Sequence, residues 1–142
     1  MKILVSEVGP RDGLQSIKRA MPTQAKHRWI RALAGAGLRE IEVASFVPPK
    51  LLPQMADAAE VVREAVKIPG LTVLALAPNL RGAQDAIAAG AHKVTLPVSA
   101  SEAHSQSNLR KSVDAAIEEV RRVVEFRNAL PAGHRPGIEV GI

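Results

Sequence analysis

Two stretches of the sequence, Gly37-Leu-Arg-Glu-Ile-Glu-Val43 and Gly90-Ala-His-Lys-Val-Thr-Leu96, decide the fold. Each stretch begins at a glycine, which readily adopts the left-handed conformation that ends a helix. Each then continues into a short alternating run with β-branched residues, which is typical of a strand. Apolar residues at helical spacing precede both glycines. The two stretches therefore mark helix-to-strand junctions of a repeated unit.

The same alternation runs along the whole chain. Strands are expected at residues 3–8, 39–44, 71–77, 92–98 and 137–142. Helices are expected from about Gln24 to Gly37, after Pro53, from Asn79 as N-cap to Gly90, and from about Asn108 to Leu130. Four repeats of strand then helix predict an α/β fold with a parallel sheet and right-handed crossovers.

A (β/α)8 TIM barrel and a doubly wound sheet both fit this pattern. No Gly-x-Gly-x-x-Gly follows the first strand, which disfavours the dinucleotide-binding version of the doubly wound sheet. About four and a half βα units make up roughly half of a barrel of ~250 residues. We expect residues 1–142 to form the N-terminal part of a TIM barrel within a longer protein. A complete, small flavodoxin-like domain is the alternative.

The composition excludes several classes of protein. The 142 residues are 46% apolar and 23% charged, as in an ordinary globular protein and unlike a disordered tail. The chain has 23 Ala but only 2 Phe, 1 Trp and no Tyr, which favours helices packed closely on a sheet. It has no Cys, so these residues contain no disulfide, zinc ribbon or cysteine nucleophile. No apolar run reaches bilayer length and no leader is evident, so we expect a cytoplasmic protein.

The net charge of +5 and the pI near 10.1 raise the question of an anionic partner. Acidic residues interleave with the basic ones, which is typical of a solvated surface. The scarcity of aromatic side chains argues against stacking on nucleic-acid bases. The alternatives left open are attraction of a phosphate-bearing small molecule and a non-catalytic basic binding module.

Polar residues gather after the expected strand ends, where the active sites of parallel α/β folds lie. Arg11 and Asp12 stand in a turn bounded by glycines and a proline, after the first strand. Asp12 is suited to ligate a hard divalent cation, and Arg11 is suited to stabilise an oxyanion. A surface ion pair in a turn explains the pair equally well. Glu42 lies within the second strand, either facing a barrel mouth or outward into solvent.

Further polar residues follow the third and fourth strands. Asn79 is readily explained as a helix cap, and Ser99 and Ser101 as loop residues. His104 is the one histidine on an expected active-face loop. No His-x-His or His-x-x-x-His spacing suggests a metal site.

Several motifs resemble those of hydroxymethylglutaryl-CoA lyases. They are Glu7-Val-Gly-Pro-Arg-Asp-Gly-Leu-Gln15, Ile41-Glu-Val-Ala-Ser-Phe-Val47, Pro49-Lys50, Pro53-Gln-Met-Ala-Asp57, Ala77-Pro-Asn-Leu80, and Ser99-Ala-Ser-Glu102 with Asn108. They occur in the family's order over essentially the whole chain. Val-Gly-Pro before Arg-Asp-Gly favours the lyases over the wider superfamily, which usually begins with a Thr-Leu-Arg-Asp-Gly-x-Gln type of motif.

The resemblance implies a TIM barrel with bound Mg²⁺ or Mn²⁺. It also implies retro-Claisen cleavage of 3-hydroxy-3-methylglutaryl-CoA to acetoacetate and acetyl-CoA, as in leucine degradation. In that family Arg11 would stabilise the enolate, Asp12 would ligate the metal and Glu42 would be catalytically important. Four residues would support the substrate nearby: Gln15, Ser45, Asn79 and Ser101. The partner that the resemblance implies is an acyl-CoA substrate. We also expect further copies of the chain, since an incomplete barrel associates through its open edges, and no nucleic acid or membrane.

The sequence also departs from the family. The family requires a later His-x-His metal pair, a metal-ligating asparagine and a catalytic cysteine in a glycine-rich loop, and none of these is present. We therefore expect the 142 residues alone to be inactive and to bind metal weakly. A related acyl-CoA lyase or a condensing synthase of the same superfamily remains an alternative.

Overall fold

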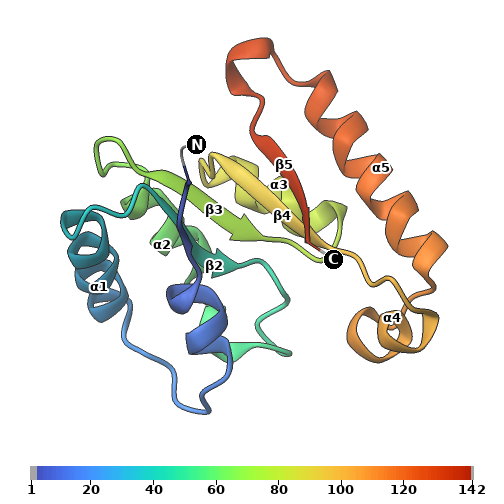
Figure 1. The fold of residues 1–142 in the computed structure, drawn as a ribbon, viewed down its shortest axis with the longest axis horizontal. Helices are drawn as coiled ribbons and strands as arrows, with labels where there is room; N and C mark the ends of the chain where they lie inside the picture. Colours follow the sequence, from blue (N-terminus) through green and yellow to red (C-terminus); the bar gives the residue numbers. More distant parts are fainter. Residues whose placement is uncertain (1–2, 142) are drawn as a thin grey trace.

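The computed structural model describes residues 3–141, and it shows a parallel five-stranded sheet in the order β1-β2-β3-β4-β5 (Figure 1). Met1, Lys2 and Ile142, at the ends of the expected partial-barrel domain, lie outside the described residues. The strands are β1 Ser6–Glu7, β2 Glu40–Ser45, β3 Thr72–Leu76, β4 Lys93–Pro97 and β5 Gly137–Gly141. The sequence order of the parallel strands confirms the predicted βα repeat.

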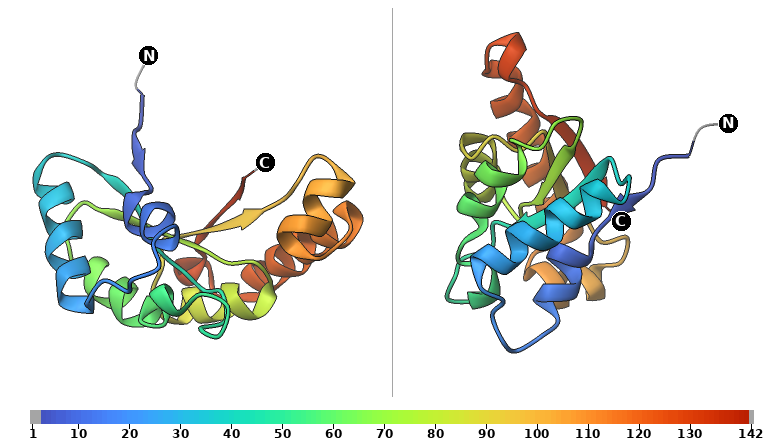
Figure 2. Two further views of the ribbon diagram at one scale, coloured as in Figure 1. Left: turned by 90° about the horizontal axis from the view of Figure 1, so that it is seen from below. Right: turned by 90° about the vertical axis from the view of Figure 1, so that its left-hand side faces the viewer.

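The helices form an outer layer on one side of the sheet. They are α1 Thr23–Gly35, α2 Ala58–Ala65, α3 Leu80–Ala88 and α5 Val113–Ala129, whereas α4 Glu102–Leu109 packs against α5 beyond the carboxyl end of β4 (Figure 1). Three short turns complete the set: η1 Gly9–Gly13, which is π-helical, and the 3₁₀ turns η2 Pro53–Met55 and η3 Ala132–His134. Figure 2 (left) shows the helices in an arc around the sheet, with η1 on the concave side. This is the geometry of about half a (β/α)8 barrel.

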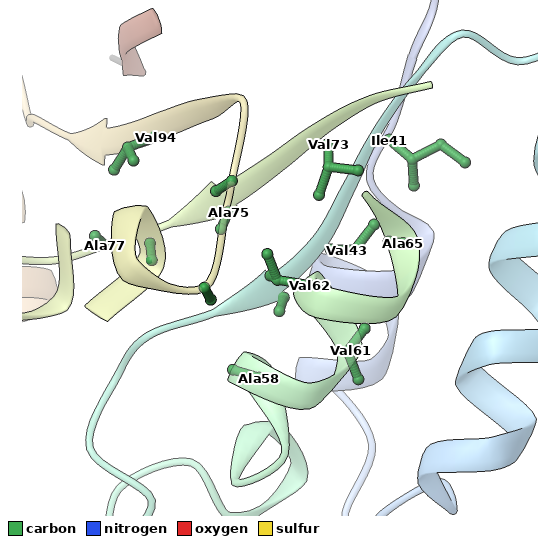
Figure 3. Close-up of a cluster of buried hydrophobic side chains, with 14 of the residues drawn as sticks. Ile41, Val43, Ala58, Val61, Val62, Ala65, Val73, Ala75, Ala77 and Val94 are labelled. Atoms are coloured by element: carbon green, nitrogen blue, oxygen red, sulfur yellow. The ribbon is translucent and has the colours of Figure 1, made fainter. Parts of the chain in front are cut away.

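The core lies between the sheet and α2. Val43 on β2 and Val73 on β3 are fully buried against Val61 and Val62 of the helix (Figure 3). Alanines fill most of the remaining positions, so the helices approach the sheet closely. Gly82 on α3 shows how close: a Cβ there would lie 2.8 Å from the carbonyl oxygen of Phe46.

The two glycine junctions have the predicted geometry. Gly37 follows α1 with φ of +102°, and Gly90 follows α3 with φ of +96°. A side chain at either position would be strained, because L residues rarely adopt positive φ. The chain then enters β2 and β4 directly.

The concave face of the sheet carries charged groups. Ile41 and Val43 pack under the helices, and the alternation of a strand turns Glu40 and Glu42 to the other face. Lys93 on β4 donates hydrogen bonds to Glu40 Oε2 at 2.6 Å and to Glu139 Oε1 at 2.7 Å. The hydrogen bonds to Glu139 and Glu40 raise the pKa of Lys93 above its ordinary value, and burial only partly opposes them. One ammonium therefore links β2, β4 and β5.

Three expectations about secondary structure were wrong. The first strand is two residues long instead of spanning 3–8, because pairing with β2 starts only where Ser6 meets Glu40. The helix after Pro53 divides into η2 and α2. The long helix expected from Asn108 divides into α4 and α5, because Arg110 takes a left-handed conformation with φ of +54° and Ser112 caps a new helix.

Among residues 3–141, no helix combines the length and the apolar character required to cross a bilayer.

Candidate functional site

The motif after β1 folds into the π-helical turn η1. The N–H groups of Arg11 and Asp12 both donate to the carbonyl of Val8, at 3.0 and 2.7 Å. Glu7 Oε1 accepts the N–H of Gly9 at 2.6 Å, and a Cβ at Gly9 would lie 2.7 Å from that oxygen. A side chain at position 9 would therefore displace the Glu7 carboxylate from this bond. π-helical turns are rare in proteins, and those that occur are often found at functional sites.

The turn places Arg11 on Glu42. Arg11 Nε donates to Glu42 Oε2 at 2.5 Å, and Arg11 Nη1 donates to Asp12 Oδ1 at 2.8 Å. The Glu42 side chain is 3% exposed, that of Arg11 is 16% exposed and that of Asp12 is 60% exposed. The structure thus brings together the three residues that the sequence singled out. Their solvent exposure increases from Glu42 through Arg11 to Asp12.

The low exposed fraction of Glu42 decides between the two orientations expected for its side chain. The alternative of an outward-facing, solvated Glu42 is wrong, because the residue is 2% exposed. A buried carboxylate is costly without a partner, and the Arg11 guanidinium supplies the partner. Arg11 Nη2 makes no hydrogen bond within the described part of the chain, so its N–H groups remain available to a ligand.

A buried lysine that the sequence analysis missed holds the neighbouring loops. Lys26 on α1 is 2% exposed, and its Nζ donates to Asp57 Oδ1 and to the carbonyl of Gln54, each at 2.6 Å. Thr23 also donates to Asp57, at 2.8 Å, and the amide of Gln54 donates to the carbonyl of Ile17 at 2.5 Å. These bonds tie the loop after η1 to the loop after β2.

Asn79 and Ser101 both cap helices. Asn79 Oδ1 accepts the N–H of Gly82 at 2.9 Å, as the cap expected for α3. Ser101 Oγ accepts the N–H of His104 at 3.3 Å, at the start of α4. Gln15 is exposed, and its side chain makes no hydrogen bond within residues 3–141. A contact of any of these three residues with substrate stays a prediction.

Ser45 is fully buried at the end of β2, and its Oγ has no hydrogen-bond partner. It borders a groove of about 370 Å³ that Asn79, Gly82 and the loop after β2 also line. The hydroxyl itself is closed to solvent, so a ligand reaches it only if the neighbouring side chains move.

Glu119 on α5 binds the backbone next to Asn79, at the N-terminus of α3. Its Oε1 accepts the N–H of Leu80 at 2.7 Å, and its Oε2 lies 3.3 Å from Lys111 Nζ. Burial raises the pKa of Glu119, but the hydrogen bond from Leu80 and the charge of Lys111 outweigh it and leave the pKa below its ordinary value. A charged carboxylate therefore binds the N-terminus of α3, where the helix dipole favours it.

A second polar pair lies after β4. Ser99 Oγ and His104 Nδ1 are 2.8 Å apart, and Ser99 is buried while His104 is exposed. Neither residue belongs to the group around Arg11.

The metal-binding capacity of the described residues is limited. Asp12 offers an open carboxylate, which is a hard ligand suited to Mg²⁺ or Mn²⁺. Residues 3–141 contain no group of three or more His, Cys, Asp or Glu side chains placed to hold a metal. Asp12 thus fits as one ligand of a metal whose other ligands this part of the chain does not provide.

Comparison with known proteins agrees with the motifs. Residues 2–139 match the HMGL-like family model. The mitochondrial hydroxymethylglutaryl-CoA lyase of Gallus gallus is 44% identical over 135 residues, which cover 95% of this chain and 44% of that protein. A 3-hydroxy-3-isohexenylglutaryl-CoA/hydroxymethylglutaryl-CoA lyase of Pseudomonas aeruginosa is 45% identical over 124 residues, or 87% of this chain and 41% of that protein. The chain spans less than half the length of these relatives.

Solved structures show the same relationship. A hydroxymethylglutaryl-CoA lyase from Pseudomonas aeruginosa superposes with a TM-score of 0.88 at 41% identity, over 98% of this chain and 45% of that one. An HMG-CoA lyase from Acinetobacter baumannii, in complex with coenzyme A and 3-methylmalate, gives 0.87 at 33% identity, over 96% and 43%. These matches confirm the predicted fold, the N-terminal part of a TIM barrel. The chain belongs to the HMGL-like family.

Proposed function

We propose that this chain supplies part of the active site of a hydroxymethylglutaryl-CoA lyase-type enzyme, a carbon–carbon lyase. The reaction is cleavage of 3-hydroxy-3-methylglutaryl-CoA to acetoacetate and acetyl-CoA. The observation that carries the proposal is the Arg11 guanidinium held by buried Glu42 beside the open carboxylate of Asp12. Relatives named for this activity, at 40–45% identity, support the reaction class.

Arg11 stabilises the charge that develops during cleavage. Removal of the proton from the tertiary hydroxyl turns that carbon into the ketone of acetoacetate as the carbon–carbon bond breaks. The bonding electrons pass into the thioester, whose oxygen becomes an enolate, and protonation at carbon gives acetyl-CoA. Arg11 Nη2 is the group free to donate to that oxygen, and a charged donor in a fixed position favours the transition state.

Asp12 would ligate a divalent cation, Mg²⁺ or Mn²⁺. Such a cation would act as a Lewis acid on the substrate and assist loss of the hydroxyl proton. Asp12 is 60% exposed, so its carboxylate is accessible on the site's open side. The remaining ligands and the proton donor to carbon come from outside residues 3–141.

Glu42 fixes the direction of the guanidinium. Its bond to Nε leaves the far edge of the guanidinium for substrate, and its burial keeps the pair from exchanging with water. Gln15, Ser45, Asn79 and Ser101 are proposed to support substrate nearby.

The substrate class is a 3-hydroxy-3-alkylglutaryl-CoA ester. The Pseudomonas aeruginosa relative is named for two such esters, which differ in the alkyl group. The Acinetobacter baumannii structure with coenzyme A supports a CoA ester. We propose a cytoplasmic homo-oligomer, since a mouse relative is named cytoplasmic and open sheet edges favour association.

The proposal is tested by assaying acetyl-CoA release from 3-hydroxy-3-methylglutaryl-CoA by the protein as it occurs in its source. Asp12→Ala is expected to lower kcat at least a hundredfold and to weaken activation by added Mn²⁺. Asp85→Ala, which removes an exposed carboxylate from α3, is the matched control. Cleavage that survives Asp12→Ala unchanged would contradict the role of Asp12, and absence of cleavage by the unaltered protein would contradict the function.

A further inference from the structure

The helix α4 presents a histidine that is held in place by a buried hydroxyl. Ser99 Oγ lies 2.8 Å from His104 Nδ1, and Ser99 is 4% exposed. The backbone N–H of the same histidine is held by Ser101 Oγ at 3.3 Å. The imidazole of an exposed residue is thus fixed from the buried side, whereas exposed side chains ordinarily rotate freely.

His104 lies on the same side of the fold as the Arg11 site. Ser99 follows the end of β4 at Pro97, and η1 follows the end of β1, so both segments lie at the carboxyl ends of the parallel strands. Figure 2 (left) shows η1 and α4 on the near side of the sheet, with the concave face between them. Both segments therefore border the edge of the sheet at which the parallel strands end.

The hydrogen bond to Ser99 decides what the ring offers to a ligand. When the Ser99 hydroxyl donates to Nδ1, the neutral ring carries its proton on Nε2. When the ring is charged, both nitrogens carry protons and Ser99 accepts. Both forms present an N–H at Nε2, which has no partner within the described residues. A third form, the neutral ring with its proton on Nδ1, has no N–H at Nε2. An anionic ligand therefore favours the first two forms over the third.

Two charged residues of this segment, Glu102 and Lys111, already have partners. Glu102 accepts hydrogen bonds from the N–H of Val113 and from the amide of Gln106, which lower the pKa of Glu102 in that order of size. Lys111 is paired with Glu119. His104 therefore remains as a donor without an internal partner on α4.

We propose that His104, oriented by Ser99, donates a hydrogen bond from Nε2 to an anionic oxygen of the acyl-CoA ester. The proposal rests on the proposed function and adds a substrate-contacting residue to it, with Ser99 as its positioning residue. The anionic oxygen belongs either to the free carboxylate of the acyl group or to a phosphate of coenzyme A. Both are acceptors of the same chemistry, and separate ligands distinguish them.

The test follows the imidazole and guanidinium resonances of the ¹⁵N-labelled chain by NMR at fixed pH. Coenzyme A serves as the phosphate probe and glutarate as the carboxylate probe. We expect one of them to shift the His104 ring and Arg11 Nε together. We expect His104→Ala to weaken that ligand about tenfold, or about 1.4 kcal/mol, and Ser99→Ala about threefold. His134→Ala, which removes an exposed histidine from η3, is the matched control and leaves the affinity unchanged.

The outcomes separate this inference from the proposed function. A ligand that shifts Arg11 and binds His104→Ala as tightly as the unaltered chain would overturn the role of His104 and leave the function standing. An unchanged affinity in Ser99→Ala, with a loss in His104→Ala, would overturn the positioning role. If neither probe shifts His104, the inference fails, and the cleavage assay of the protein as it occurs in its source still decides the proposed function.

Discussion

Arg11 and Glu42 are 31 positions apart in the chain and are joined by a hydrogen bond of 2.5 Å between Nε and Oε2. The bond connects a π-helical turn to the inner face of β2. It neutralises a buried carboxylate and at the same time leaves Nη2 of the guanidinium without an internal partner. One contact therefore stabilises the fold and prepares a donor for a ligand.

Removal of Arg11 should destabilise the chain more than removal of the Glu42 charge. Arg11→Met leaves Glu42 buried and unpaired, so we expect a loss of about 2–4 kcal/mol in the free energy of unfolding. Glu42→Gln leaves a cation that reaches solvent, so the loss should be smaller, about 1–2 kcal/mol. The double variant should lose less than the sum, with a coupling of about 1–2 kcal/mol in urea unfolding.

The exposed pair Arg81–Asp85 is the control for this cycle, with side chains 82% and 48% exposed. Its coupling should stay below about 0.5 kcal/mol. Equal couplings for the two pairs would show that burial of Glu42 adds nothing to the bond with Arg11.

The ammonium of Lys93 should make stability depend on alkaline pH. The hydrogen bonds to Glu139 and Glu40 raise the pKa of Lys93 in the folded chain. Its contribution is therefore complete below the unfolded pKa of about 10.4 and is lost as pH rises through the folded pKa. Lys93→Met should cost about 1–2 kcal/mol at pH 7, and the difference from the unaltered chain should shrink above pH ~10.

Lys67→Met removes a lysine that pairs with Glu64 at the surface, and it should change stability by less than about 0.5 kcal/mol at either pH. A Lys93→Met penalty that stays constant from pH 7 to 11 would contradict the ionic origin of its effect. The comparison uses differences between chains, so general alkaline destabilisation cancels.

The fold was largely predictable because its signals are local. The backbone at positions 37 and 90 has a positive φ, which glycine adopts readily. The alternating apolar and polar residues after each glycine are typical of a strand. The break at Arg110 was not predictable, because arginine carries no preference for the left-handed region and only the caps at Ser101 and Ser112 mark the two helices. Capping serines look like loop residues until a helix is seen to start from them.

Glycine substitutions in two helices should have opposite effects. Gly82→Ala places a Cβ 2.8 Å from the carbonyl oxygen of Phe46, so the helix must move and we expect a loss of about 1–3 kcal/mol. Gly35→Ala, at the end of α1, meets nothing within 4 Å and should gain about 0.5 kcal/mol. Thermal unfolding of both variants gives the comparison, and a gain in Gly82→Ala would disprove the close approach of α3.

Metal binding by the 142-residue chain should be weak. Asp12 is one ligand, and residues 3–141 provide no group of three. Calorimetric titration with Mg²⁺ and with Mn²⁺ should give dissociation constants well above the micromolar range, and Asp12→Ala should remove the residual binding. Micromolar affinity in the unaltered chain would contradict the incomplete site.

The candidate site was predictable in its members and not in its contacts. Arg11 and Asp12 follow β1 and Glu42 lies within the neighbouring strand β2, so their proximity follows from a parallel sheet. The pairing of Arg11 with Glu42 depends on the π-helical turn. The residue pattern of Gly9–Gly13 does not predict this turn. Lys26 was missed because its partner Asp57 lies on another element, and a buried ion pair across 31 positions leaves no local pattern.

The role of Arg11 in cleavage is tested most directly by assaying the protein as it occurs in its source with 3-hydroxy-3-methylglutaryl-CoA. Acetoacetate and acetyl-CoA should form in equal amounts. Arg11→Gln should lower kcat at least a thousandfold, or about 4 kcal/mol, with a smaller change in KM, while Arg31→Gln on α1 should leave both unchanged. Cleavage by Arg11→Gln at the unaltered rate would contradict the account.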